Sequence, residues 1–325
     1  MKIKNKNYST LWVENSKIKI IDQTKLPFKL IIKELKTLGD FCRAITQMEV
    51  RGAPLIGVTA AFGLALALRK DASSKNIDKS INALLETRPT AVNLRWALSY
   101  IFKRIKNKKI QDRAKLSLEL AKKIRQEDII NCFKIGLNGY KIIEKIYKKK
   151  KKPINILTHC NAGWLATIDW GTALSPIFLA NRNGLPVHIW VDETRPRNQG
   201  ALLTAWELKN EKIPYTIIVD NAGGYLMQKK EVDLCIVGSD RTTSRGDVCN
   251  KIGTYLKALS AFDNNIPFYV AVPQSTIDFK IDDSRKIPIE VRSSKELSHL
   301  SFLKKKKIST AEIYFRNSNK FNPAF

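Results

Sequence analysis

Five short apolar runs, separated by segments with helical periodicity, organise the second half of the chain. Each run has the length of a buried strand, and a proline comes shortly before four of the five. Strands that alternate with helices favour a parallel sheet with crossover helices. The expected fold class is therefore α/β, with a Rossmann-like domain whose mainly parallel sheet contains residues 154–158, 187–191, 215–219, 234–237 and 268–272.

The first half has a different pattern. Residues 10–13 and 17–21 alternate apolar and polar positions, which predicts a small antiparallel sheet. Helical patterns follow, and the one at 55–69 is apolar nearly all round, so that helix should be buried. The lysine run at 148–152 is typical of a solvated connector. We expect an N-terminal sheet-plus-helix domain at 1–147, a basic linker at 148–153 and the Rossmann-like domain at 154–325.

Polar residues follow the predicted strands at their carboxyl ends, where ligands bind to open parallel sheets. Cys160 follows the first strand, and a helix expected from about Gly163 would lower the pKa of its thiol. The alternative is a buried, unreactive cysteine. Asp240 follows the fourth strand and would act as a general acid or base if burial raised its pKa; the alternative is a turn or cap carboxylate.

Two arginines lie beside prolines that are typical of a helix start. Arg51 precedes Gly52-Ala53-Pro54, and Arg88 precedes Pro89-Thr90. The free N–H groups of a helix amino end, with an arginine beside them, suit a phosphate. The alternative for the first motif is an ordinary buried helix with a capped start. A loop with Gly246 and Asp247 as turn residues precedes a further helix, expected to begin near Asn250-Lys251.

Histidines and cysteines do not form a metal motif in the sequence. His159 adjoins Cys160, but neighbouring residues of a strand point to opposite faces, so a Cys–His nucleophile pair is not expected. His188 lies inside an apolar strand and fits a hydrogen-bonded core histidine. We expect no metal site. No glycine-rich dinucleotide or P-loop motif follows the first strand, which argues against NAD and ATP sites.

The net charge of +27 invites comparison with nucleic-acid-binding proteins. Removing the nine lysines of the runs at 148–152 and 304–307 leaves +18, so the charge is spread over the chain. Lysine dominates over arginine, and we expect no specific nucleic-acid partner. Five cysteines without disulfide spacing, and no signal sequence or long apolar run, predict a soluble cytoplasmic protein without membrane attachment.

Ten short motifs lie in order over nearly the whole chain: Asp22-Gln-Thr-Lys-Leu-Pro27, Arg51-Gly-Ala-Pro54, Thr87-Arg-Pro-Thr-Ala-Val-Asn-Leu94, Thr158-His-Cys-Asn161, Glu193-Thr-Arg-Pro-Arg197, Gln199-Gly200, Leu203-Thr-Ala-Trp-Glu-Leu208, Asp220-Asn-Ala-Gly-Gly-Tyr-Leu-Met227, Gly246-Asp-Val-Cys-Asn-Lys-Ile-Gly-Thr-Tyr255 and Ser275-Thr-Ile-Asp278. Together they resemble the methylthioribose-1-phosphate isomerase family, the aldose–ketose isomerases of methionine salvage. The resemblance implies the two-domain fold above, a homodimer, a sugar-phosphate substrate and no cofactor.

The same resemblance implies roles for individual residues. Asp240 would be the acid/base group, and Cys160 would be a second catalytic residue that stabilises the transition state. Residues that would hold the sugar phosphate are Arg51, Gly52, Ala53, Arg88, Gln199, Asn250 and Lys251.

Two alternatives stay open. A sibling isomerase acting on ribose-1,5-bisphosphate or 5-deoxyribose-1-phosphate would differ only in its pocket for the C5 substituent. Regulatory subunits of the translation-initiation guanine-nucleotide exchange factor are expected to lack the Cys160–Asp240 pair. Family members usually continue past the equivalent of Asn322-Pro-Ala-Phe325 with a turn and a helix, so we expect weaker domain or dimer packing in a chain ending there.

Overall fold

The computed structural model describes residues 1–3, 6–289, 293–304 and 307–312. A five-stranded parallel sheet, in the order β12-β9-β6-β7-β8, forms the second half and confirms the predicted fold class. The last strand ends two residues before the predicted position 272. The strands are β6 (Ile154–Thr158), β7 (Val187–Asp192), β8 (Tyr215–Ile218), β9 (Leu234–Val237) and β12 (Phe268–Val270).

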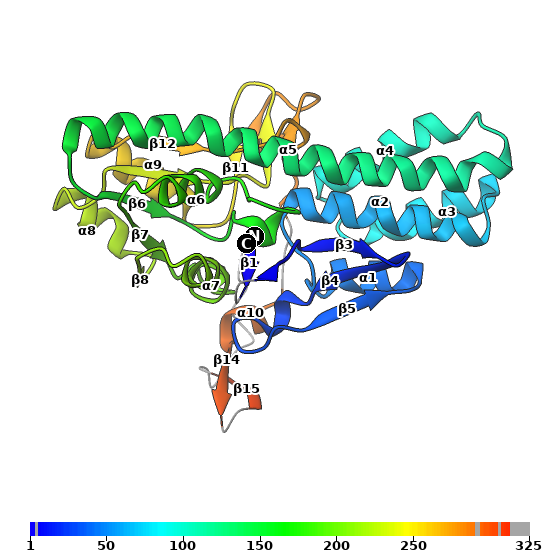
Figure 1. Ribbon diagram of the computed structural model, residues 1–325, viewed down its shortest axis with the longest axis horizontal. Helices are drawn as coiled ribbons and strands as arrows, with labels where there is room; N and C mark the ends of the chain where they lie inside the picture. Colours follow the sequence, from blue (N-terminus) through cyan, green and yellow to red (C-terminus); the bar gives the residue numbers. More distant parts are fainter. Residues whose placement is uncertain (4–5, 290–292, 305–306, 313–325) are drawn as a thin grey trace.

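Helices cover both faces of this sheet. Successive side chains of a strand point to opposite faces, so Ile156 packs with α5 and α6, whereas Leu157 packs with α8 and α9. Figure 1 shows this doubly wound arrangement in green and yellow on the left. The helices are α6 (Ser175–Arg182), α7 (Ala205–Asn210), α8 (Ala222–Gln228) and α9 (Thr254–Asp263).

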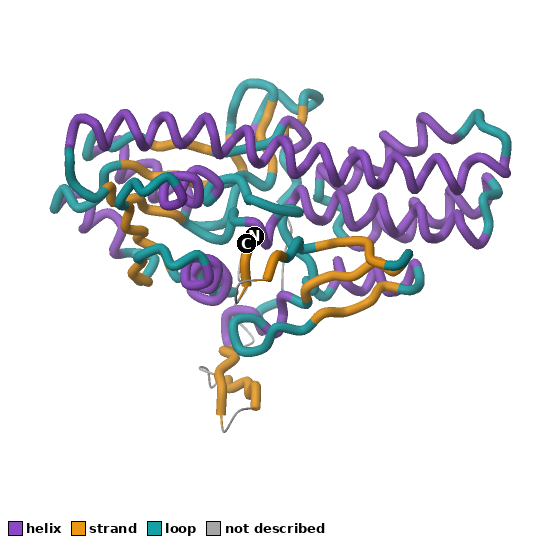
Figure 2. The backbone as a smooth tube through the Cα atoms, viewed as in Figure 1, coloured by secondary structure: helices purple, strands orange, loops and turns teal. Residues whose placement is uncertain are grey.

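The first half is a layer of helices over a three-stranded antiparallel sheet, as Figure 2 shows. The sheet has the order β3-β4-β5 and contains the two predicted strands. Its strands are β3 (Leu11–Glu14), β4 (Lys17–Ile21) and β5 (Ile32–Leu35), and its helices are α1 (Leu38–Thr46), α2 (Ala53–Lys70), α3 (Ser74–Thr87), α4 (Val92–Ile105) and α5 (Ile110–Lys150).

Helix α2 forms the centre of the N-terminal core. Among the described residues it alone is long and apolar enough to cross a membrane, yet 72% of it is buried inside the protein. A helix that is apolar all round needs such an environment, and α1, α3, α4 and α5 supply it.

Helix α5, of 41 residues, runs along both halves of the molecule (Figure 1). It continues through Lys150, so the predicted linker at 148–153 is wrong in its first part: residues 148–150 belong to the helix. Lys148, Lys149 and Lys150 do not break a helix, and the first helix-breaking residue, Pro153, comes only after them. The division into two domains stays a prediction.

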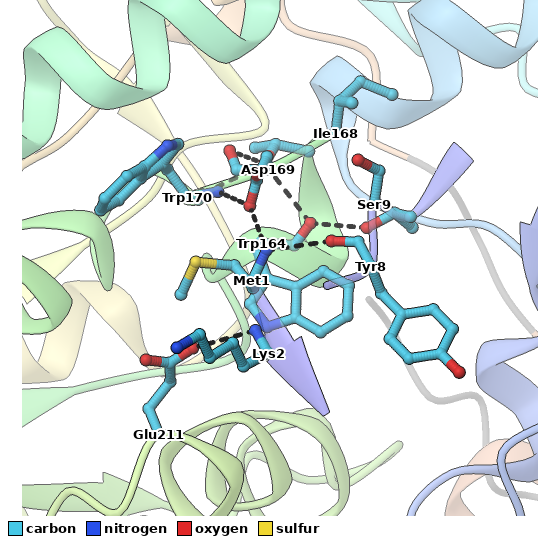
Figure 3. Close-up of polar contacts among 12 residues, drawn as sticks. Met1, Lys2, Tyr8, Ser9, Trp164, Ile168, Asp169, Trp170 and Glu211 are labelled. Carbon is cyan, nitrogen blue, oxygen red and sulfur yellow. Dashed lines mark hydrogen bonds and ion pairs between the residues drawn. The ribbon is translucent and has the colours of Figure 1, made fainter. Parts of the chain in front are cut away.

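A short hairpin, β1 (Lys2–Ile3) with β2 (Lys6–Asn7), fastens the first residues to the Rossmann-like half. Figure 3 shows the Met1 ammonium donating to Asp169 Oδ1 and to the Tyr8 carbonyl oxygen, each at 2.9 Å. The Lys2 N–H donates to Glu211 Oε1 at 3.3 Å. These contacts place the N-terminal hairpin against the segment that follows β6.

The segment after β9 forms two short strands, β10 and β11, that the sequence did not predict. They pair with β13, which follows β12, in a small sheet of order β11-β10-β13. Helix α9 begins at Thr254 rather than near Asn250-Lys251. Residues 313–325 lie outside the described part, so the expectation about the chain end is untested. The remaining elements are β10 (Arg241–Thr243), β11 (Val248–Cys249), β13 (Ile277–Asp278), α10 (Lys295–Ser298), β14 (His299–Lys304) and β15 (Lys307–Glu312).

Candidate active site

A cavity of about 90 Å³ lies at the carboxyl edge of the parallel sheet. The neighbours β6 and β9 mark the point where the strand order reverses, which is where ligands bind in open α/β sheets. Cys160 follows β6 and Asp240 follows β9. All nine residues predicted for the site line this one cavity: Arg51, Gly52, Ala53, Arg88, Cys160, Gln199, Asp240, Asn250 and Lys251.

Cys160 lies in a turn whose backbone is held by two threonines. Its φ of +64° is in the left-handed region, which is uncommon for a residue with a side chain. The Cys160 N–H donates to Thr194 Oγ1 at 2.8 Å, and Thr204 Oγ1 donates to the Cys160 carbonyl oxygen at 2.7 Å. Backbone conformations of this kind persist where surrounding contacts enforce them, often at functional sites.

The expected helix after Cys160 is absent, and the predicted thiol pKa is wrong. A 3₁₀ turn at Trp164–Ala166 follows instead, and α6 begins only at Ser175. Burial raises the pKa of the Cys160 thiol, although Lys251 and Arg51 act in the opposite direction. The cavity therefore contains a protonated thiol at neutral pH, a hydrogen-bond donor rather than a thiolate.

Arg51 and Gly52 form the start of α2 at the cavity wall, as predicted. Gly52 caps the helix with a φ of +94°, and a Cβ at this position would lie 2.5 Å from the Ala166 carbonyl oxygen. The Arg51 guanidinium is 9% exposed and donates to the Asn161 carbonyl oxygen at 3.1 Å and to Asn161 Oδ1. Burial lowers the pKa of Arg51, which the neighbouring Cys160, Glu207 and Asp240 oppose.

Two buried polar atoms in the cavity residues lack a hydrogen-bond partner within the described part of the chain. They are Arg51 Nε, a donor, and Gln199 Oε1, an acceptor. Buried polar groups are normally hydrogen-bonded. Their residues share the lining of the cavity, so the wall offers unused hydrogen-bonding capacity to a polar ligand.

Glu207 of α7 is a buried group that the sequence analysis did not single out. Its carboxylate accepts hydrogen bonds from the Trp164 N–H at 2.9 Å, the Leu165 N–H at 3.1 Å and Asn161 Nδ2 at 2.9 Å. Burial raises its pKa to about 7. Glu207 thus holds Asn161, which in turn holds Arg51. A lone acid within the Leu203–Leu208 motif was the available signal.

Arg88 lines the cavity, but not at a helix start. It follows the last residue of α3 and is half-buried, whereas α4 begins at Val92, after a turn that contains Pro89. Arg241 donates to the Thr90 carbonyl oxygen at 2.7 Å and so ties this turn to the segment of Asp240.

Asp240 is exposed, so the burial on which its predicted acid–base role depended is not present. Its N–H donates to the Cys249 carbonyl oxygen at 2.9 Å, which fixes the turn after β9. Asn250 and Lys251 lie in the loop before α9, and Asn250 Nδ2 donates to Thr254 Oγ1 at 3.0 Å. The site's acid and its polar groups therefore lie on segments that meet only in the folded chain.

His159, Asp192 and Asp220 place potential metal-ligating atoms within 4.8 Å of one another, a cluster that sequence spacing concealed. Lys257 already provides a cation there: its Nζ lies 3.2 Å from Asp192 Oδ2 and donates to the Asp220 carbonyl oxygen. The two ring nitrogens of His159 contact Asp192 Oδ2 and the Ile252 carbonyl oxygen, not Cys160. His188 donates or accepts at Thr216 Oγ1, 2.9 Å away, and is half-exposed rather than in the core.

A second cavity, of about 380 Å³, adjoins the first and shares Met48, Arg51 and Gln199 with it. Its apolar lining includes Leu26, Phe28, Leu202 and Leu203. Arg197 also lines it and forms an ion pair with Glu296 at 2.8 Å.

Residues 49–325 match the Initiation factor 2 subunit family. The chain is 56% identical over 304 residues to "Methylthioribose-1-phosphate isomerase" from Escherichia coli O45:K1 (strain S88 / ExPEC), covering 92% of this chain and 82% of that protein. It is 52% identical over 331 residues to a relative of the same name from Sinorhizobium medicae (strain WSM419), covering 100% of this chain and 91% of the relative.

Solved structures with the same fold carry two kinds of title. A 5-methylthioribose 1-phosphate isomerase from Pyrococcus horikoshii OT3 superimposes with a TM-score of 0.79 at 38% identity, covering 90% of this chain and 83% of that chain. The translation initiation factor eIF-2B, subunit delta, from A. fulgidus gives 0.77 at 36% identity, covering 98% and 90%. The chain belongs to the Initiation factor 2 subunit family and, within it, to the methylthioribose-1-phosphate isomerases.

Proposed function

We propose that the protein converts 5-methylthioribose-1-phosphate to 5-methylthioribulose-1-phosphate, an aldose–ketose isomerisation of methionine salvage. The observation that supports this most strongly is the convergence of all nine predicted site residues on one cavity at the carboxyl edge of the sheet. Curated relatives that are 50–56% identical carry the isomerase name, so the regulatory-subunit alternative is not favoured.

The substrate determines what the site must do. Its phosphate is on the anomeric oxygen, so the furanose ring cannot open as freely as a hemiacetal. Hydrogen moves from C2 to C1, the ring oxygen gains a proton and the C2 hydroxyl loses one. Oxidation at C2 thereby balances reduction at C1. The hydrogen travels either as a hydride or through an enediol-like intermediate.

Asp240 and Cys160 are the proposed catalytic residues. Asp240 protonates the ring oxygen and takes up the proton released by the C2 hydroxyl, so it ends the cycle as it began. Because burial raises the pKa of the Cys160 thiol, its S–H is available as a donor to an oxygen that gains negative charge. Substrate bound in the cavity would cover the exposed Asp240 and bring its carboxyl group into contact with the sugar.

The phosphate-binding residues of this proposal supply positive charge from three segments. Arg51, Arg88 and Lys251 line the cavity together with the amino end of α2. Arginine forks and free helix N–H groups both suit a phosphate dianion. The apolar lining of the adjoining cavity would take the methylthio group. Arg197 in that lining is paired with Glu296, but Lys295 and Arg51 line the same cavity, so it is the turnover test that separates the methylthio substrate from ribose-1,5-bisphosphate.

We also propose a cytoplasmic homodimer. The five cysteines are all free thiols, which suits a reducing compartment. The outer side of α9 exposes large apolar side chains, between 46% and 85% accessible, and contiguous patches of this kind are typical of interfaces. These residues are Tyr255, Leu256, Leu259 and Phe262.

The test is turnover of 5-methylthioribose-1-phosphate by the purified protein, followed by NMR beside Asp240→Asn, Cys160→Ser and the control Cys249→Ser. Loss of the acid should lower kcat by about 10²- to 10⁴-fold. Cys249 neighbours Asp240 through its backbone but does not line the cavity, so its variant should keep the parental rate. If the protein turned over ribose-1,5-bisphosphate but not 5-methylthioribose-1-phosphate, the proposed substrate would be wrong. Full activity of Asp240→Asn would refute the mechanism.

A further inference from the structure

His159, directly after β6, is 1% exposed and faces a hydrogen-bond acceptor at each ring nitrogen. Its Nδ1 lies 2.7 Å from Oδ2 of Asp192, the buried last residue of β7. Its Nε2 lies 2.7 Å from the carbonyl oxygen of Ile252, in the loop that carries Asn250 and Lys251. Both distances are those of strong hydrogen bonds.

To satisfy both contacts, the pair needs one more proton than a neutral imidazole and an ionised carboxylate carry together. A carbonyl oxygen only accepts, so Nε2 must carry hydrogen. A neutral imidazole then has a bare Nδ1, which would face an oxygen with no hydrogen between them. The extra proton lies either on Nδ1 or on Asp192. Lys257 Nζ, 3.2 Å from the same Oδ2, favours the ionised carboxylate and hence the protonated ring.

We propose that His159 is a positioning residue: as an imidazolium bound to Asp192, it fixes the Asn250–Lys251 segment at the active-site cavity through its hydrogen bond to Ile252. This rests on the proposed function, in which that segment holds the substrate's phosphate. His159 itself lines the cavity floor and adds a fixed positive charge there.

Packing strengthens the same connection. Gly253, which caps α9 with a φ of +99°, leaves room for the imidazole: a Cβ there would lie 2.8 Å from His159 Cε1. One turn further along α9, Lys257 reaches back to Asp192. The C-terminal end of the loop is therefore held twice, by the His159 ring at Ile252-Gly253 and by Lys257 from the helix that follows.

Other titratable groups surround the pair. Burial raises the pKa of the Asp192 carboxyl, and the hydrogen bond from His159 and the charge of Lys257 oppose that shift. Ionised Asp192 and Asp220 together balance the imidazolium and the ammonium in charge. The groups that face the pair are Lys257 of α9, Asp220 after β8, Glu193 after β7 and Cys235 of β9.

The protonation state is tested by ¹H–¹⁵N NMR of the three histidines in ¹⁵N-labelled protein at about pH 8, well above the usual imidazole pKa of about 6.5. His159 should show two protonated nitrogens, whereas His188, whose pKa is lowered by burial, should show one. In Asp192→Asn the new amide can donate to Nδ1, so that nitrogen should become unprotonated. A wild-type His159 with a bare Nδ1, unchanged by Asp192→Asn, would place the proton on Asp192 and overturn the proposal.

The positioning role is tested by steady-state kinetics of His159→Gln beside the control His188→Gln. Displacing a phosphate-binding segment by about an ångström should raise KM by about 10- to 100-fold, with a much smaller change in kcat. The His188 ring contacts Thr216 and Trp190 and does not line the cavity, so its variant should keep the parental KM. Equal KM values in the two variants would overturn the proposal.

Failure of the proposed function would be recognised separately. The NMR experiment needs no substrate. Because it measures the protonation of His159 in the wild-type protein, it remains a test of the proposal if His159→Gln does not fold. Should the wild type turn over no sugar phosphate, the affinity for inorganic phosphate, measured by calorimetry, replaces KM as the readout for the two variants.

Discussion

Gly52 offers a direct test of how the cavity is shaped. It caps α2 between Arg51 and Ala53, with a φ of +94° that side chains rarely adopt. The substitution Gly52→Ala adds one methyl group, 2.5 Å from the Ala166 carbonyl oxygen and 2.6 Å from its Cα. These atoms belong to backbone, so the new methyl can be accommodated only if the α2 start or the turn at Ala166 moves.

The structure supplies a control with nearly the same φ. Gly246 has a φ of +93°, and a Cβ there meets nothing within 4 Å. Alanine at such a positive φ costs about 1–2 kcal/mol at either glycine. At Gly52 the overlap with Ala166 adds about 1–3 kcal/mol. We therefore expect Gly52→Ala to lower the free energy of unfolding by about 2–5 kcal/mol, and Gly246→Ala by about 1–2 kcal/mol.

The measurement combines chemical denaturation with steady-state kinetics. Because the amino end of α2 lines the cavity, moving it should raise KM by about tenfold or more in Gly52→Ala. Gly246→Ala should keep the parental KM. If both variants lose the same stability and both bind substrate normally, close approach at Gly52 does not shape the cavity and the reasoning is wrong.

Three further predictions concern other parts of the molecule. Burial raises the pKa of Asp128 to about 7, so its contribution to stability falls as pH rises from about 4 to about 7. Asp128→Asn, which keeps the bond from the Ile168 N–H, should be more stable at pH 8 by on the order of 4 kcal/mol and equal near pH 4 by urea denaturation. Burial also raises the pKa of the Cys160 thiol above 9.0, so iodoacetamide should label it more slowly than free cysteine at neutral pH, and rapid labelling by mass spectrometry would contradict this. On the proposed dimer face, Leu259→Asp should give monomers in light scattering, whereas Ile110→Asp, at a residue of α5 that is 60% exposed against 46% for Leu259, should stay dimeric.

Elements whose apolar pattern decides their packing could be predicted from the sequence. The five parallel strands and the pair β3–β4 lie where periodicity placed them, because burying one or both faces of a strand fixes its residues. Helix α2 is buried as its composition requires. Cys160 and Asp240 share one cavity, since residues at the ends of neighbouring parallel strands meet at one edge of the sheet. The other seven predicted residues of the cavity were assigned to the site by the family resemblance.

Features set by contacts between distant residues could not be predicted. In place of the helix expected after Cys160 there is a 3₁₀ turn whose first N–H groups, of Trp164 and Leu165, donate to Glu207, more than forty residues away. The proline rule misplaced the start of α4, since Pro89 occupies a turn instead. Likewise, the hydrogen bond between His159 and Asp192 joins residues 33 positions apart and leaves no local pattern.

Two buried carboxylates, neither of which lines the cavity, explain how its positive groups are kept in place. Glu207 holds Asn161, whose amide oxygen binds Arg51. On our proposal Asp192 does the same for His159, which holds the loop of Lys251. In each case one residue, Asn161 or His159, stands between the acid and the segment that carries the cation. The acid thus balances charge and fixes orientation, while the cation faces the phosphate. Changing either acid should therefore weaken substrate binding although neither would touch the substrate, because a buried hydrogen bond to a charged group contributes about 1.5–3 kcal/mol to the geometry it enforces.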